Sequence, residues 1–144
     1  MKVANYFLIM KYIGLDPGTH TGVAVWDTDK GEFSTLETLP LWKAMLLIRD
    51  LYLTDSVEVI FEDARLRRWF GNAGREQLQG AGSIKRDCSI WEEFLLGSGI
   101  PFRAMPPTAG QTKWSAEYFR KVTGWKGRTS EHARDAAILV FGRH

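Results

Sequence analysis

The sequence predicts an α/β domain built on a five-stranded mixed sheet, and three observations lead to this fold class. The chain has 144 residues, the length of one domain. Its composition, 44% hydrophobic and 25% charged, is typical of a globular protein and excludes a disordered or fibrous chain. Short apolar runs alternate with segments of helical periodicity in the order βββαβαβαα. We expect one domain over residues 1–144, with 1–10 as a candidate N-terminal extension.

The first half of the chain should form an antiparallel three-strand meander, a helix and a buried strand. An apolar run over 11–15 stops at Asp16-Pro17-Gly18-Thr19, and two further strand-like runs cover 21–27 and 33–39. Helical spacing follows Pro40 over 41–53. The β-branched run 57–61 ends at Glu62. Because a helix separates this run from the meander, it should pair parallel to the first strand through a right-handed crossover.

The second half should supply three helices and the last strand. Residues 76–96 have helical character, although two glycines weaken the first half of this segment and glycines at 97 and 99 end it. A strand is expected over 101–105, closed by two prolines. Helices are expected over 111–122 and from a cap at Thr129 or Ser130 through Val140.

Composition also excludes several classes of protein. No apolar run approaches the roughly 18 residues of a membrane span. The N-terminus lacks a small-residue cleavage site, which argues against a secretory signal. The single cysteine, Cys88, cannot form an internal disulfide and fits a reducing compartment. We therefore expect a cytoplasmic protein that does not contact a membrane.

Charge is segregated along the chain. The net charge is only +2, but residues 64–75 hold four arginines and no acid. Residues 101–128 hold six basic residues against Glu117 alone, so the rest of the chain is acidic. Two basic segments beside an acidic remainder suggest that a polyanion is held near carboxylates.

Three acids and a histidine are expected to meet at one edge of the sheet. Asp16 and Glu62 end two strands that should be parallel neighbours, and α/β sheets bind ligands at that carboxyl edge. His132 and Asp135 are three residues apart on the last helix and share a face. Such a cluster is electrostatically costly unless a hard divalent cation such as Mg²⁺ or Mn²⁺ lies within it. Two such ions can activate water and stabilise the leaving oxygen of a phosphodiester.

Each of these residues also has a structural interpretation. The segment Asp16-Pro17-Gly18 could be a simple turn, and Glu62 could be an exposed strand end. Asp135 could be a first-turn charge favoured by the helix dipole, and a lone His132 is more often structural than a ligand. The combination of the four is more specific than any one member.

The segments that carry these residues resemble the RuvC-type Holliday-junction resolvases of the ribonuclease H-like superfamily. The resemblance covers residues 11 to 142, and its opening motif alone is shared with sugar-kinase-like relatives. The matching segments are Ile13-Gly14-Leu15-Asp16-Pro17-Gly18-Thr19 with Thr21-Gly22-Val23-Ala24, Val59-Ile60-Phe61-Glu62-Asp63, Pro106-Pro107 with Lys113, and His132-Ala133-Arg134-Asp135-Ala136-Ala137.

The resemblance implies a ribonuclease H-like fold and a nuclease of phage or prophage style that resolves four-way DNA junctions into symmetric nicks. It makes Asp16, Glu62, His132 and Asp135 the catalytic set and the ligands of two Mg²⁺ ions, with Mn²⁺ as a substitute. Asp16 would bridge the ions, and His132 would be a ligand or would orient the attacking water. The family often has a carboxylate where His132 falls. Asp63 and Glu131 flank this set and are reserve ligands.

The resemblance also implies a homodimer, because a four-way junction needs two symmetric nicks. The helix expected over 76–96 is the candidate interface. Its apolar stripe of Ile90, Trp91 and Phe94 could serve that interface or the protein's own core.

Basic and aromatic side chains are candidates for contacts with branched DNA. Arginines directly after Glu62 could hold phosphates, and the aromatics beside them could stack on an unpaired base or pack on the core. Lys113 is favoured by the resemblance, and Lys121 by charge alone. The candidates are Arg65, Arg67, Arg68, Trp69, Phe70, Lys113 and Lys121.

Two other classes of function are left open. A nuclease of the same fold could act on RNA or on RNA–DNA hybrids, and it would then read the 2′-hydroxyl. A non-catalytic protein could bind junctions, or bind a nucleotide as the sugar-kinase-like relatives do. A binder would keep its affinity without Mg²⁺ and would never nick. The acidic set argues against a binder, and the short chain argues against nucleotide binding.

Overall fold

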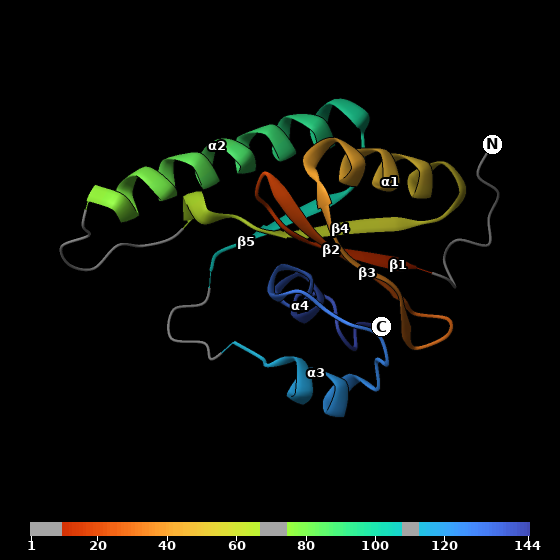
Figure 1. The fold of residues 1–144 in the computed structure, drawn as a ribbon. Helices are drawn as coiled ribbons and strands as arrows, with labels where there is room; N and C mark the ends of the chain where they lie inside the picture. Colours follow the sequence, from red (N-terminus) through yellow and green to blue (C-terminus); the bar gives the residue numbers. More distant parts are fainter. Residues whose placement is uncertain (1–9, 67–74, 108–112) are drawn as a thin grey trace.

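The computed structural model describes residues 10–66, 75–107 and 113–144, with only the backbone described over 75–81. Within these ranges five strands form one sheet in the order β3-β2-β1-β4-β5 (Figure 1). The strands are β1 (Lys11–Asp16), β2 (His20–Asp27), β3 (Glu32–Pro40), β4 (Val57–Glu62) and β5 (Phe102–Met105). The helices are α1 (Leu41–Thr54), the short 3₁₀ helix η2 (Ala64–Leu66), α2 (Arg75–Ser98), α3 (Ala116–Thr123) and α4 (Glu131–Ile138).

The strand pairing confirms the predicted mixed sheet. Strands β1, β2 and β3 form an antiparallel meander, and β4 pairs parallel to β1 on one side and to β5 on the other. Leu15 lies opposite Phe61 at the last pair of the β1–β4 ladder. The next residue on each strand is Asp16 or Glu62, so both carboxylates leave the sheet at the same edge.

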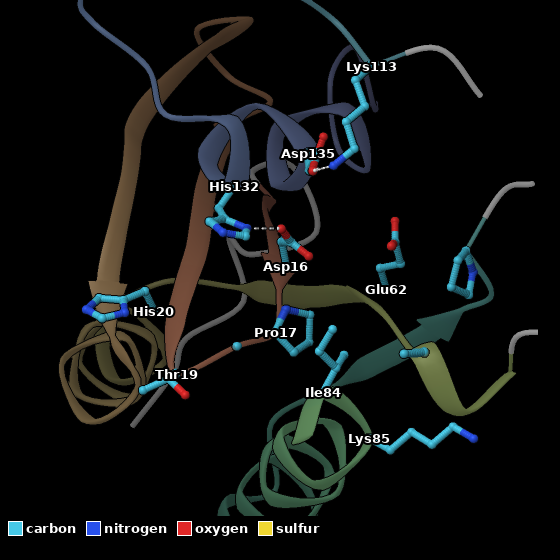
Figure 2. Close-up of a pocket in the computed structure, with 13 residues that line it drawn as sticks. Asp16, Pro17, Thr19, His20, Glu62, Ile84, Lys85, Lys113, His132 and Asp135 are labelled. Carbon is cyan, nitrogen blue, oxygen red and sulfur yellow. Dashed lines mark hydrogen bonds and ion pairs between the residues drawn. The ribbon is translucent and has the colours of Figure 1, made fainter. Parts of the chain in front are cut away.

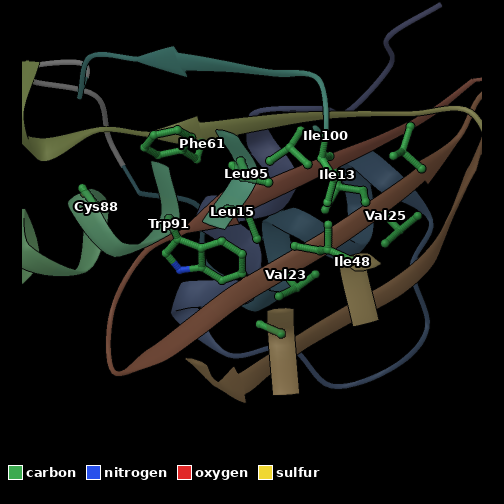
Figure 3. Close-up of a cluster of buried hydrophobic side chains, with 13 residues drawn as sticks. Ile13, Leu15, Val23, Val25, Ile48, Phe61, Cys88, Trp91, Leu95 and Ile100 are labelled. Atoms are coloured by element: carbon green, nitrogen blue, oxygen red, sulfur yellow. The ribbon is translucent and has the colours of Figure 1, made fainter. Parts of the chain in front are cut away.

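Helices cover both faces of the sheet (Figure 1). Helices α1 and α2 pack on one face, where Trp91 of α2 and Ile48 of α1 are buried against Leu15, Val23 and neighbouring strand residues (Figure 3). Helices α3 and α4 pack on the other face, where α4 buries three alanines against β1, β2 and β3 and Phe119 of α3 joins the same apolar cluster. The alternation along β1 and β2 thus divides the core into two layers.

Two helix boundaries differ from the sequence expectation. Helix α3 begins at Ala116, not at residue 111, because the Ser115 hydroxyl accepts a hydrogen bond from the Tyr118 amide at 3.1 Å and caps the helix. Residues 113–115 precede it without helical structure, and 111 and 112 lie outside the described ranges. Helix α4 is capped by Ser130, as one of the two expected caps, but it ends at Ile138 and passes into a turn instead of continuing through Val140.

Helix α2 extends slightly beyond its expected end. Gly97 lies inside the helix, and the chain leaves it at Gly99, which has a φ of 69°. This left-handed conformation favours glycine, so Gly99 and not Gly97 stops the helix. No helix in the described ranges is long and apolar enough to cross a membrane.

Candidate active site

A pocket of about 370 Å³ lies at the carboxyl edge of β1 and β4 (Figure 2). The four residues predicted to be catalytic, Asp16, Glu62, His132 and Asp135, all line it. Figure 2 shows Asp16 and Glu62 rising from adjacent strands toward α4, which carries the other two. Ile84 and Lys85 of α2 form the opposite wall.

Two glycines allow α4 to lie directly on the sheet. A Cβ atom at Gly22 would stand 2.1 Å from the carbonyl oxygen of His132, and one at Gly14 would stand 2.0 Å from that of Ala136. No side chain larger than hydrogen fits either position without moving the helix. Because β1 carries Gly14 two residues before Asp16, this close approach brings His132 and Asp135 over the end of β1.

Asp16 is a partly buried carboxylate that contacts His132. Its Oδ2 lies 2.8 Å from Nδ1 of His132, and its side chain is 18% exposed. Burial raises the pKa of Asp16; the hydrogen bond and charge of His132 oppose this rise, and the charge of Asp135 adds to it. Without a bound cation, the folded protein therefore favours the ionised form of Asp16 less than water does.

Lys113 neutralises the acids on the other side of the pocket. Its Nζ lies 2.6 Å from Oε1 of Glu131 and 3.0 Å from Oδ2 of Asp135. Hydrogen bonds to these two carboxylates raise the pKa of Lys113, and the hydrogen bond from Lys113 lowers the pKa of Glu131. An ammonium group thus supplies positive charge beside Asp135.

The donor set of the pocket suits a hard divalent cation, although its side chains are not arranged around one. No three His, Cys, Asp or Glu side chains in the described part of the chain converge on a single metal position. Three carboxylates and an imidazole nevertheless line the same pocket, and burial raises the pKa of Asp16 although the charges of His132 and Lys113 oppose this rise. A metal ion beside Asp135 would compete with the Lys113 ammonium, which contacts Oδ2 of this carboxylate.

The two reserve ligands do not line the pocket. Asp63 is 2% exposed and its carboxylate contacts the Arg65 guanidinium, with Oδ2 2.7 Å from Nη2. Glu131 is bound to Lys113 at the rim. The structure therefore brings together the four expected residues without either reserve.

The candidate DNA-binding residues are distributed differently. Lys113 lines the pocket, Arg65 forms ion pairs with Asp63 and Glu92, and Lys121 is exposed on α3, outside the pocket lining. The remaining four candidates, Arg67, Arg68, Trp69 and Phe70, lie outside the described residues. Of the apolar stripe of α2, Trp91 is buried in the core and Phe94 packs against it, whereas Ile90 is half-buried.

Two pocket residues had not been singled out from the sequence. His20 follows the Asp16 turn and lines the pocket, and a histidine so close to the opening motif was the available signal. Ile84 reaches the pocket only because α2 docks across the end of the sheet, and no local pattern indicates this. Lys85, beside it, belongs with Arg86 to the basic residues that the sequence predicts to extend the DNA-binding surface.

This sheet order, with helices on both faces and the acidic residues at the ends of β1 and β4, defines a ribonuclease H-like fold. Among solved structures, the chain is similar to RuvC of T. thermophilus in complex with a Holliday junction substrate. The TM-score is 0.58 at 17% sequence identity, over 92% of this chain and 91% of that chain. No protein-family model and no curated protein sequence matches the chain. At this identity the similarity concerns the fold, and it agrees with the fold expected from the sequence.

Proposed function

We propose that the protein is a divalent-metal-dependent endodeoxyribonuclease that resolves four-way DNA junctions. The observation that carries this proposal is that Asp16, Glu62, His132 and Asp135 line one pocket at the carboxyl edge of the sheet. The fold likeness to a RuvC that was solved with a Holliday junction supports the choice of substrate. Function belongs to the site, so the junction specificity needs its own test.

Each pocket residue has a distinct role in this reaction. Asp16, Glu62 and Asp135 would hold Mg²⁺, or Mn²⁺ in its place, with Asp16 shared between two ions. When bound, two such ions activate a water and stabilise the leaving oxygen of a phosphodiester. His132, whose Nδ1 lies 2.8 Å from Asp16, would be a further ligand or would orient the attacking water. Lys113, released from Asp135, would contact the phosphate.

Branched DNA would bind across the pocket between α2 and α4. The arginines Arg67 and Arg68 and the lysines Lys113 and Lys121 are the proposed phosphate contacts, and Trp69 and Phe70 are the proposed stacking residues. The protein would act as a homodimer in the cytoplasm, because two symmetric nicks require two sites related by a two-fold axis.

Cleavage of a synthetic four-way junction in Mg²⁺, beside a linear duplex of equal length, tests the proposal. We expect symmetric nicks in the junction only. The Asp16→Asn variant should still bind the junction but should cleave it more than about 100-fold more slowly. Such a loss is larger than the loss of activity that is typical when a residue that only orients a metal ligand is removed. Asp29→Asn, at an exposed carboxylate after β2, is the matched control and should cut normally.

Other outcomes of the same assay select the alternatives. Equal cutting of junction and duplex would identify a general nuclease on this fold. Faster cutting of an RNA–DNA hybrid would identify a ribonuclease. Binding without cutting in both Mg²⁺ and Mn²⁺ would identify a non-catalytic junction-binding protein.

A further inference from the structure

One turn of α2, residues 88–92, is linked to both loops that follow the strands bearing Asp16 and Glu62, directly to the second and through Thr21 of β2 to the first. The sheet brings the two carboxylates to one edge, but the β1–β4 ladder ends at Leu15 and Phe61, one residue before each, so no direct pairing joins Asp16 to Glu62. Asp16 pairs instead with Gly22 on β2, and Glu62 pairs with Met105 on β5. What holds the two following loops therefore also contributes to the separation of the carboxylates.

The loop after Asp16 is held by a buried chain of hydrogen bonds. Nε1 of Trp91 donates to the Thr21 hydroxyl at 3.4 Å, and that hydroxyl donates to the carbonyl oxygen of Gly18 at 2.8 Å. Trp91 and Thr21 are fully buried. Because Gly18 lies two residues after Asp16, this chain ties the Asp16 turn to α2.

The loop after Glu62 is held by ion pairs to the next residue along α2. The Arg65 guanidinium contacts Asp63 through two nitrogens, at 2.9 and 2.7 Å, and Nη2 lies 2.9 Å from Oε2 of Glu92. Asp63 directly follows Glu62 and is 2% exposed. The Sγ atom of Cys88, on the same turn of α2, lies 3.9 Å from the carbonyl oxygen of Glu62.

We infer that this turn of α2 is a positioning element that sets the separation of Asp16 and Glu62, with Arg65 and Trp91 as its connecting residues. The inference rests on the proposed function, because it concerns the geometry of the same metal site. It gives Arg65 a role other than the phosphate contact expected from the sequence. Partners that orient metal ligands typically change metal affinity or activity about 10- to 100-fold when they are removed.

The surroundings of Arg65 favour positioning over phosphate binding. Its Nε, Nη1 and Nη2 atoms all donate to acceptors of the protein. Two carboxylates face this single guanidinium, so the cluster is negative overall and does not attract a phosphate. The planar fork of arginine suits two carboxylates at once, which a lysine at this position would not reproduce.

Arg65→Lys separates the two roles of the arginine. We expect the variant to bind a four-way junction in EDTA as tightly as the wild type, with the same dependence on salt. Its affinity for Mn²⁺, measured by electron paramagnetic resonance of the free ion, should fall about 10- to 100-fold. Arg103→Lys, in the exposed Arg103–Glu58 pair on the same sheet, is the matched control and should leave both quantities unchanged.

Trp91→Phe tests the other connection. The substitution removes the indole N–H and keeps an aromatic ring in the core, and we expect Mn²⁺ affinity to fall by about tenfold. Trp125→Phe is the matched control, because Nε1 of Trp125 is buried without a hydrogen-bond partner in the described part of the chain. Circular dichroism of each variant checks that the fold is kept.

The results distinguish this inference from the proposed function. Weaker junction binding in EDTA, with a salt slope lower by about one and normal Mn²⁺ affinity, would make Arg65 a phosphate contact and overturn the inference. Unchanged Mn²⁺ affinity in both Arg65→Lys and Trp91→Phe, or no Mn²⁺ binding by the wild type, would also overturn it. If the wild type binds Mn²⁺ but does not nick junctions while both variants lose Mn²⁺ affinity, the positioning element stands and the proposed function fails.

Discussion

Cys88 shows how a single buried residue supports the site without chemistry of its own. The thiol is fully buried under the end of β4, and this burial raises its pKa to about 11. Because the thiolate is the reactive form, a thiol with so high a pKa is inert at neutral pH. The residue thus packs the positioning turn of α2 and should not serve as a nucleophile or a redox sensor.

Alkylation of Cys88 tests this interpretation. The native protein should react with iodoacetamide at pH 8 about 100-fold more slowly than a model thiol of pKa 9.0, from ionisation alone. The rate should rise about tenfold per pH unit up to pH 10, because the thiolate fraction keeps growing below a pKa of about 11. Mass spectrometry measures the rate. The protein in urea is the control, and a native profile that levels off near pH 9 would contradict the raised pKa.

At the residue scale, the four residues predicted from the sequence do line one pocket, but the contacts that hold neighbouring residues such as Arg65 were not predictable. Asp16 and Glu62 were predictable because parallel neighbouring strands end at one edge, and His132 and Asp135 because their spacing puts them on one face of a helix. The role of Arg65 was not predictable, because its partner Glu92 is 27 residues away and meets it only after α2 docks on the sheet. From the sequence alone, an arginine close to a predicted catalytic acid is interpreted as a phosphate contact, because the Glu92 partner is not apparent.

At the scale of elements, the position of α4 depends on the absence of side chains beneath it. Gly14 and Gly22 on the strands face a helix whose buried residues are alanines. Both glycines lie in the opening motif of the sequence, but the motif alone does not indicate that a helix packs against them. Their function is steric, since they set how close the helix bearing His132 and Asp135 lies to Asp16.

Gly22→Ala should move α4 away from the sheet and separate His132 from Asp16. The new methyl group would stand 2.1 Å from the His132 carbonyl oxygen, so either the helix or the strand must shift. We expect the free energy of unfolding, measured in urea, to fall by about 1–3 kcal/mol, together with a loss of Mn²⁺ affinity.

Gly97→Ala provides the matched control for that substitution. A Cβ atom at Gly97 meets nothing within 4 Å, and the residue lies inside α2. Alanine there should therefore stabilise the protein by up to about 1 kcal/mol. If Gly22→Ala proved as stable as the wild type with unchanged Mn²⁺ affinity, the close packing of α4 would not be what places the site.

The start of α3 was another element-scale difference, and side-chain capping explains it. The apolar and polar pattern over 111–122 resembled one helix, but Ser115 bonds to the Tyr118 amide and begins the helix four residues before its first buried aromatic, Phe119. A serine in such a segment can be an interior residue or a cap, and only the folded structure shows that the Ser115 hydroxyl bonds to the Tyr118 amide as a cap.

At the scale of the whole molecule, the fold gathers acidic residues from both ends of the chain around one pocket. Asp16 comes from the first strand and Asp135 from the last helix, and the burial of Asp16 raises its pKa. A raised carboxylate pKa favours the folded state at low pH, and this contribution is lost as the pH rises through the raised value. At neutral pH, the ionised Asp16 carboxylate thus lowers stability unless a cation is bound beside it.

Thermal unfolding with and without Mg²⁺ tests this link between site and stability. At about 100 times its dissociation constant, an ion that binds only the folded state stabilises it by about 2.7 kcal/mol, which for a domain of this size corresponds to a rise in Tm of roughly 5–10 °C. Asp16→Asn should have a higher Tm than the wild type without metal, because it removes the disfavoured charge, and should lose most of the response to Mg²⁺. Asp29→Asn should respond as the wild type does. An equal Mg²⁺ response in Asp16→Asn would place the ion outside the pocket, because the loss of a shared ligand cannot leave the affinity of that site unchanged.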